Sequence, residues 1–138
     1  MSSEPFPVTI FHNPACGTSR NTLAMIEASG ETPTVVRYVE EGWTRPQLEE
    51  LLAAMHSSPR EILRTSGTPA EALGLTADGV ADDDILAAMV AHPILVNRPI
   101  VQTPKGTRLC RPSEAVYALL RTPPERFVKE DGEVVGAE

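Results

Sequence analysis

The stretch Val8-Thr9-Ile10-Phe11-His12-Asn13-Pro14-Ala15-Cys16-Gly17-Thr18-Ser19-Arg20 predicts the first strand of the protein and the start of its first helix. The first four of these residues are apolar or β-branched, as is typical of a strand. Residues 17–29 are compatible with a helix, and Gly30 stands where a glycine commonly follows the end of one. We therefore expect Cys16 at the junction where a strand ends and a helix begins.

A cysteine at such a junction has an electrostatic reason to be reactive. The first N–H groups of a helix have no partner within it and carry partial positive charge, which stabilises both a thiolate and a bound oxyanion. The alternative is that Cys16 is a small buried hydrophobe, which is the commoner role of a free cysteine. Pro14 and the small or polar residues 17–19 do not resemble core packing, so the flanking sequence favours a reactive thiol.

The length and composition favour one domain with a packed core. The chain has 138 residues, of which 41% are hydrophobic. We expect no membrane span, because no apolar run approaches about 18 residues, and no signal peptide before the first strand. Two cysteines 94 positions apart do not form the dense disulfide framework of a small secreted protein, so we expect a cytoplasmic location.

The charged residues exclude one class of partner. The formal net charge of −7 opposes general nucleic-acid binding. The basic residues are ten arginines and only two lysines, and arginine is the better side chain for gripping a tetrahedral oxyanion with two hydrogen bonds. A GC-rich genome would produce the same ratio, so the ratio alone does not decide between the two explanations.

Strand signals recur along the chain. We expect strands at residues 8–11, 34–38, 94–96, 99–103 and 107–110. The first two flank the predicted helix at residues 17–29 and therefore indicate a parallel βαβ unit. The last two are joined by a turn at Pro104-Lys105-Gly106 and indicate a hairpin.

Helix signals dominate the middle of the chain. Capping patterns at Thr44 and Thr68, and acidic residues 82–84, each predict the start of a helix, so that residues 45–92 form a helical insertion. A final helix is expected over residues 112–120, followed by an irregular tail. The order of elements predicts an α/β fold with a thioredoxin-like core, a small mixed four-stranded sheet flanked by helices, in a single domain spanning residues 1–138.

Three stretches of the chain closely resemble the glutaredoxin-coupled arsenate reductases. They are residues 12–23, 92–101 and 106–114. Residues 129–133 fit as well, and the likeness runs from about Val8 to Val135. The resemblance implies a thioredoxin-like fold with an inserted helical region, in agreement with the pattern of elements. It also implies an enzyme that reduces arsenate to arsenite.

The resemblance further implies a set of site residues. The set contains one nucleophile, three oxyanion-binding arginines and three supporting residues: Cys16; Arg64, Arg98 and Arg111; and His12, Ser19 and Pro99. Cys16 would attack arsenate and form a thioarsenate ester. Pro99 would correspond to the cis proline that thioredoxin-like folds place beside the cysteine.

Each of these assignments has an alternative that the residues alone leave open. Arg64 could be solvated at the end of a helical turn, and Arg98 could cap a loop carbonyl. Arg111 could interact with Glu114 across the first turn of the last helix, although an arginine at a helix start opposes the dipole and hints at a bound anion. His12, at a strand end, could be a structural hydrogen-bonding histidine.

The number and positions of the cysteines determine how turnover would proceed. Ser19 stands where many redox proteins of this fold keep a second cysteine, and Cys110 reads as core packing at the end of a hairpin strand. The chain therefore needs thiols from outside. The resemblance implies glutathione, or another low-molecular-weight thiol, as co-substrate and glutaredoxin as partner, with no bound cofactor and no metal.

Two rival functions share this architecture. One is a thioredoxin-fold regulator that binds RNA polymerase, and the other is a general glutathione-linked reductase of mixed disulfides. The tyrosine-phosphatase-like arsenate reductases do not fit, because they need five residues between cysteine and arginine, whereas three separate Cys16 from Arg20.

Overall fold

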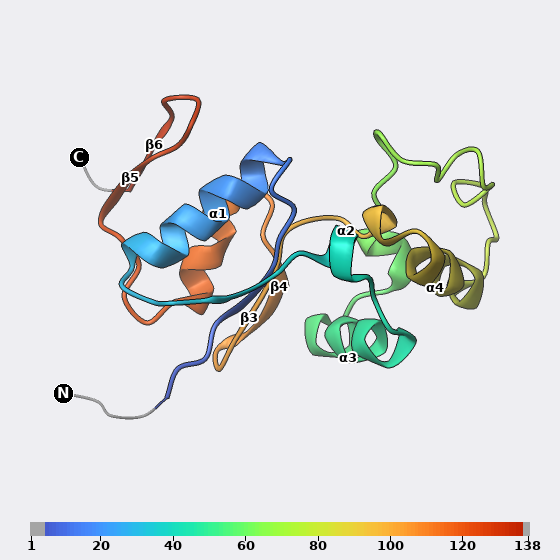
Figure 1. Ribbon diagram of the computed structural model, residues 1–138, viewed down its shortest axis with the longest axis horizontal. Helices are drawn as coiled ribbons and strands as arrows, with labels where there is room; N and C mark the ends of the chain where they lie inside the picture. Colours follow the sequence, from blue (N-terminus) through green and yellow to red (C-terminus); the bar gives the residue numbers. More distant parts are fainter. Residues whose placement is uncertain (1–4, 137–138) are drawn as a thin grey trace. The chain divides into compact units, whose positions relative to one another are not determined.

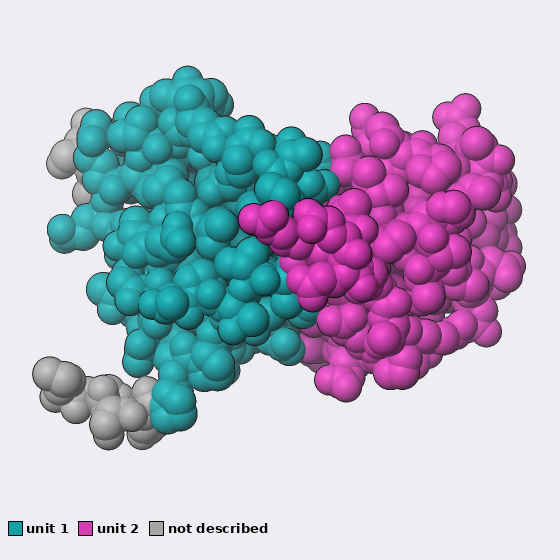
Figure 2. Space-filling view, viewed as in Figure 1, with its two compact units in different colours: residues 1–36, 98–138 teal, residues 37–97 magenta. Residues whose placement is uncertain are grey.

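The computed structural model of the protein describes residues 5–136 (Figure 1). The chain divides into two compact units, one formed by residues 1–36 and 98–138 and the other by residues 37–97 (Figure 2). The helices expected within residues 45–92 belong to the second unit, which begins at Arg37. A single domain with a helical insertion at about 45–92 stays a prediction.

The first unit contains a mixed four-stranded sheet in the order β2-β1-β3-β4. Its strands are β1 (Thr9–Phe11), β2 (Thr34–Val36), β3 (Ile100–Thr103) and β4 (Gly106–Leu109). β1 pairs in parallel with β2 and antiparallel with β3, and β3 and β4 form an antiparallel hairpin. The predicted βαβ unit, hairpin and four-stranded sheet are confirmed.

Helix α1 (Gly17–Ala28) connects β1 to β2 and starts directly after the cysteine. It ends as the sequence predicts, because Gly30 has a φ of +92° and its N–H donates to the carbonyl of Glu27 at 3.0 Å. Its inner face carries Met25 and Ile26, both fully buried. These side chains fix the face that α1 turns toward the core, and therefore where its first turn lies.

The helix expected over residues 112–120 is present as a 3₁₀ helix, η3 (Ser113–Leu119). Its N–H groups bond three residues back, as between Ala115 and the carbonyl of Pro112 at 3.0 Å. η3 packs against α1 (Figure 1). The core between these helices and the sheet comprises Val8, Ile10, Met25, Ile26, Val101, Cys110, Val116, Leu119 and Leu120.

The expectation of an irregular tail is wrong. Strands β5 (Arg126–Val128) and β6 (Val134–Gly136) form an antiparallel hairpin. Phe127 and Val135, which face each other across this pair, pack against the core. The turn closes because Gly132, with a φ of +95°, donates to the carbonyl of Lys129 at 2.9 Å. The charged residues and prolines of the tail obscured the alternation of more and less exposed side chains in these two strands.

The second unit is built from short helices. They are α2 (Tyr38–Glu41), α3 (Arg45–Met55), η1 (Pro59–Ile62), α4 (Asp82–Ala91) and η2 (Pro93–Leu95). α3 starts at a capping box in which Thr44 accepts from the N–H of Gln47 and the Gln47 side chain accepts from the N–H of Thr44. The starts predicted for α3 and α4 are both confirmed.

Two predicted strands differ from the observed elements. The strand expected at residues 34–38 ends at Val36, because Tyr38 begins α2. The strand expected at residues 94–96 is wrong, since η2 occupies residues 93–95. Leu95 donates to the carbonyl of His92 at 2.9 Å, which closes a helical turn in place of a ladder. Val96 forms only an isolated bridge with Leu63.

The helix predicted to start at Thr68 is also wrong, and turns occupy residues 70–76. The hydroxyl of Thr68 donates back to the carbonyl of Arg64 at 2.7 Å. One helical turn forms, in which Leu73 donates to the carbonyl of Pro69 at 2.9 Å. Gly74, with a φ of +75°, then ends it. Across residues 5–136, no helix is long and apolar enough to cross a membrane.

Candidate active site

Cys16 is the N-cap residue of α1, where the sequence predicts it. Its backbone is extended, and its carbonyl accepts the first helical hydrogen bond from Arg20 at 2.9 Å. The preceding loop is ordered by Asn13, whose carbonyl accepts from the N–H of Cys16 at 3.0 Å and whose side chain accepts from the N–H of Ala15 at 2.9 Å. Cys16 as a residue is only 8% exposed, so its surroundings strongly influence the ionisation of its thiol.

Four groups favour the thiolate form of Cys16 against the effect of burial. Burial raises the pKa of the thiol, but the N–H of Ser19, the guanidinium of Arg111, the charge of Arg98 and the N–H of Thr18 more than offset it, so that the pKa is lowered from its ordinary value. The guanidinium of Arg111 lies close to the sulfur, with Nη1 3.8 Å from Sγ. A thiol of lowered pKa and the guanidinium of Arg111 therefore lie side by side.

Arg98 and Arg111 lie together beside Cys16. Nη1 of Arg111 donates to the carbonyl of Arg98 at 2.9 Å while it approaches the sulfur. The two segments are held in register because the N–H of Cys110 donates to the carbonyl of Pro99 at 2.9 Å. Arg111 does not pair with Glu114, which instead binds Lys129 at 2.8 Å. Arg111 thus contacts Cys16 rather than Glu114, and its role as an oxyanion ligand stays a prediction.

The Arg98–Pro99 peptide bond is cis, in agreement with the position that the resemblance assigns to Pro99. A second cis bond, Arg111–Pro112, was not expected from the sequence. Each cis bond joins one of the two arginines near Cys16 to the proline that follows it.

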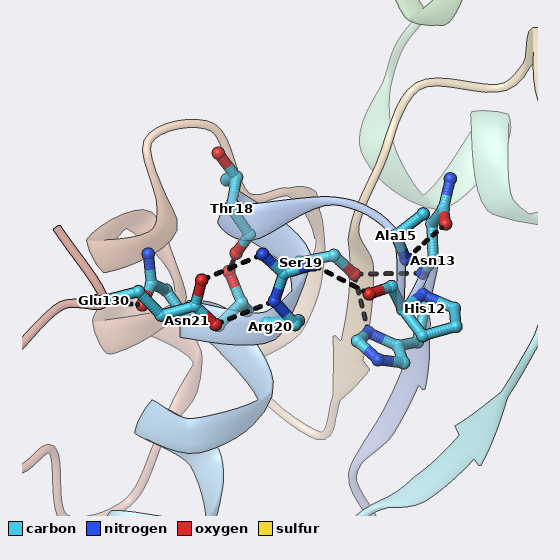
Figure 3. A network of polar contacts seen from close by, with 10 residues as sticks. His12, Asn13, Ala15, Thr18, Ser19, Arg20, Asn21 and Glu130 are labelled. Carbon is cyan, nitrogen blue, oxygen red and sulfur yellow. Dashed lines mark hydrogen bonds and ion pairs between the residues drawn. The ribbon is translucent and has the colours of Figure 1, made fainter.

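His12 and Ser19 hold the cysteine loop through buried hydrogen bonds. Nδ1 of His12 lies 2.7 Å from Oγ of Ser19, and this hydroxyl accepts from the N–H of Asn13 at 3.0 Å (Figure 3). All three side chains are buried. The hydroxyl of Ser19 therefore serves the loop backbone, and it is the N–H of Ser19 that stabilises the thiolate.

Arg64 belongs to the second unit. Its Nε donates to the carbonyl of Ser66 at 3.0 Å, and its N–H donates to the carbonyl of Leu95 at 2.7 Å. Its role as an oxyanion ligand stays a prediction.

Cys110 is buried in the core, as the sequence predicts. Burial raises the pKa of its thiol to about 12, so it stays protonated at neutral pH. Within residues 5–136, no group of three or more His, Cys, Asp or Glu side chains has an arrangement that could hold a metal ion.

Sequence reasoning missed one contact at the site. Arg20 forms a two-pronged ion pair with Glu130, from Nε to Oε2 at 2.8 Å and from Nη2 to Oε1 at 2.9 Å. The only signal was that residues 129–133 resembled a known family, and nothing local in the sequence joins two positions 110 residues apart.

The sheet topology and the cysteine at a helix start define a thioredoxin-like protein with a single activated thiol. Residues 11–119 match the model of the ArsC family, and the chain belongs to that family. The resemblance drawn from the motifs is confirmed.

Curated relatives and solved structures agree with this membership. The chain is 58% identical to the arsenate reductase ArsI2 of Synechocystis sp., covering 93% of this chain and 92% of that protein. It is 54% identical to an arsenate reductase of Escherichia coli strain K12, with the same coverage. The solved structure of an arsenate reductase from Vibrio cholerae is 35% identical with a TM-score of 0.80, covering 85% of this chain and 100% of that one.

Proposed function

We propose that this protein reduces arsenate to arsenite, with Cys16 as the nucleophile. The observation that supports the proposal most directly is a thiol of lowered pKa at the start of α1, with a guanidinium 3.8 Å from its sulfur. The relatives at 54–58% identity carry the name arsenate reductase. The cytoplasm, which is a reducing compartment, would keep such a thiol active.

In the first step the thiolate donates an electron pair to arsenic(V). An As–S bond forms, and one arsenate oxygen leaves with protons as water. Two like unit charges about 4 Å apart repel by about 4 kcal/mol at an effective dielectric constant near 20. Hydrogen bonds to charged groups contribute roughly 1.5–3 kcal/mol each, so Arg98, Arg111 and the first N–H groups of α1 suffice to offset the repulsion. Arg64 is proposed as a third ligand.

In the second step a glutathione thiolate attacks Sγ of Cys16. The electron pair of the As–S bond stays on arsenic, which is reduced to arsenic(III), while an S–S bond forms between Cys16 and glutathione. A glutaredoxin thiolate then attacks the glutathione sulfur and releases the Cys16 thiolate. An outside thiol is required because the only other cysteine, Cys110, is buried and protonated.

The test is a coupled assay with purified protein, arsenate, glutathione and glutaredoxin, which measures arsenite directly. We expect arsenite formation by the natural protein and none by Cys16→Ser, since a hydroxyl at this position cannot supply the thiolate. A second arm replaces glutathione with another small thiol. Absence of arsenite in every arm, or activity in Cys16→Ser, would contradict the proposal.

A further inference from the structure

The hairpin formed by β5 and β6 makes a direct connection to the first turns of α1. The carboxylate of Glu130, in the hairpin turn, binds the guanidinium of Arg20 through both of its oxygens. The N–H of Glu130 also donates to Oδ1 of Asn21 at 3.0 Å. Figure 3 shows Glu130 lying against Arg20 and Asn21 on α1. Three hydrogen bonds thus join the turn to the helix that begins at the cysteine.

Arg20 continues this connection into the cysteine loop. While Nε and Nη2 bind Glu130, Nη1 donates to the carbonyl of Pro14 at 2.8 Å. Pro14 comes two residues before Cys16 and Arg20 four residues after it, so the guanidinium bridges both sides of the loop. The ion pair also lies beside Gly17, where a Cβ would stand 3.6 Å from Nη2 of Arg20 and 3.8 Å from Oε1 of Glu130.

The neighbouring residue of the hairpin holds the segment that follows Arg111. Nζ of Lys129, with its side chain 10% exposed, lies 2.8 Å from Oε1 of Glu114 and 3.1 Å from Oε1 of Glu133. Glu114 lies in the first turn of η3, three residues after Arg111. Lys129 and Glu130 are consecutive residues of the hairpin turn. One binds the segment that follows Arg111, and the other binds the helix that begins after Cys16.

We propose that Glu130 is a positioning residue: by orienting Arg20 against Pro14, it holds the cysteine loop so that the N–H groups of Thr18 and Ser19 face the sulfur. The importance of this for turnover rests on the proposed function. Thiolate formation at Cys16 is measured without arsenate, and so the two ideas are tested separately.

Charge alone predicts the opposite effect of removing Glu130. The charged groups that act on Cys16 are Arg98, Arg111 and, on α1 itself, Arg20. Loss of the negative charge of Glu130 would leave Arg20 unneutralised and would favour the thiolate. Loss of positioning disfavours the thiolate, because the N–H groups no longer face the sulfur. The direction of the change therefore distinguishes a positioning role from a purely electrostatic one.

The experiment measures the rate at which iodoacetamide alkylates Cys16, as a function of pH, in the full-length protein. The modified peptide is quantified by mass spectrometry, which separates Cys16 from Cys110. The variants are Glu130→Gln and Arg20→Lys, and the latter keeps the charge but loses the planar fork. We expect the midpoint of the profile to rise in both. At a fixed pH below that midpoint, alkylation is expected to slow by about three- to tenfold.

The matched control is the ion pair between Arg121 and Glu31, in the same unit. It has the same two-pronged geometry, at 2.9 and 3.0 Å, and a similar exposure of the arginine. Arg121→Lys and Glu31→Gln are expected to reproduce the profile of the natural protein. Thermal unfolding of all four variants checks that they are folded, and the exposed positions of Arg20 and Glu130 favour this.

Unchanged profiles in Glu130→Gln and Arg20→Lys would overturn the positioning role, and so would a lower midpoint in Glu130→Gln. Equal slowing in the control variants would contradict it as well, because the effect would then be general. A natural protein that makes no arsenite but shows the expected alkylation pattern would overturn the proposed function alone.

Discussion

At the scale of single residues, the two cysteines of this chain have opposite environments. Cys16 stands at the start of α1 with N–H donors and Arg111 at its sulfur, so its pKa is lowered. Cys110 contacts the apolar core, and burial raises its pKa to about 12. The same functional group therefore has a lowered pKa in one place and a raised pKa in the other.

The role of Arg98, whose charge acts on the thiol of Cys16, can be tested by truncating its side chain. We expect Arg98→Ala to lower kcat/KM for arsenate by about one to two orders of magnitude, because a charge near the thiolate and the oxyanion is lost. Steady-state kinetics in the coupled assay check this. Arg108→Ala serves as the control, since Arg108 is an exposed arginine on β4. Kinetics of Arg98→Ala that match the natural protein would remove Arg98 from the site.

The raised pKa of Cys110 predicts a dependence of stability on pH. The folded state keeps the thiol protonated up to about pH 12, whereas an unfolded thiol loses its proton near pH 9.0, so the stability from this group falls as pH rises through that window. Between pH 8 and 10.5 we expect the natural protein to lose about 2 kcal/mol more than Cys110→Ala does. Urea unfolding of both proteins at each pH measures the difference, and parallel losses would contradict the assignment.

At the scale of elements, two capping patterns of the same spacing lead to different structures. Thr44 and Gln47 satisfy each other's backbone at the start of α3. Thr68 has the same spacing to Glu71, and its hydroxyl accepts from the N–H of Ala70 at 3.3 Å while it donates to the carbonyl of Arg64. The same pattern thus yields a helix in one place and a turn in the other, because Gly74 interrupts the second.

The cap of α3 predicts a measurable loss of stability. We expect Thr44→Ala to lower the free energy of unfolding by about 1 kcal/mol, because the N–H of Gln47 loses its acceptor. Urea denaturation measures the change. Thr44→Ser keeps an acceptor oxygen and is expected to remain within a few tenths of a kcal/mol of the natural protein. If both substitutions cost the same, the capping hydrogen bond contributes nothing.

At the scale of the whole molecule, charge is divided unevenly between the two units. Residues 37–97 contain four basic and ten acidic side chains, whereas the rest of the chain has eight basic and nine acidic ones. Screening limits exposed charges to a range of about 8 Å at physiological salt. Arg98 and Arg111 therefore govern the potential at Cys16 more than the net charge of the chain does.

The sequence by itself determined whatever depends on a few neighbouring residues. Alternation located β1 and the β3–β4 hairpin, Gly30 marked the end of α1, and Cys16 was placed at the start of that helix. Such features could be predicted because the local order of residues indicates them: alternation indicates a strand, a turn sequence a hairpin, and a glycine the end of a helix. The tertiary structure alone decided that Arg111 approaches Cys16 and that Glu130 binds Arg20. These contacts join positions 95 and 110 residues apart, and only the packing of the folded chain brings such groups together.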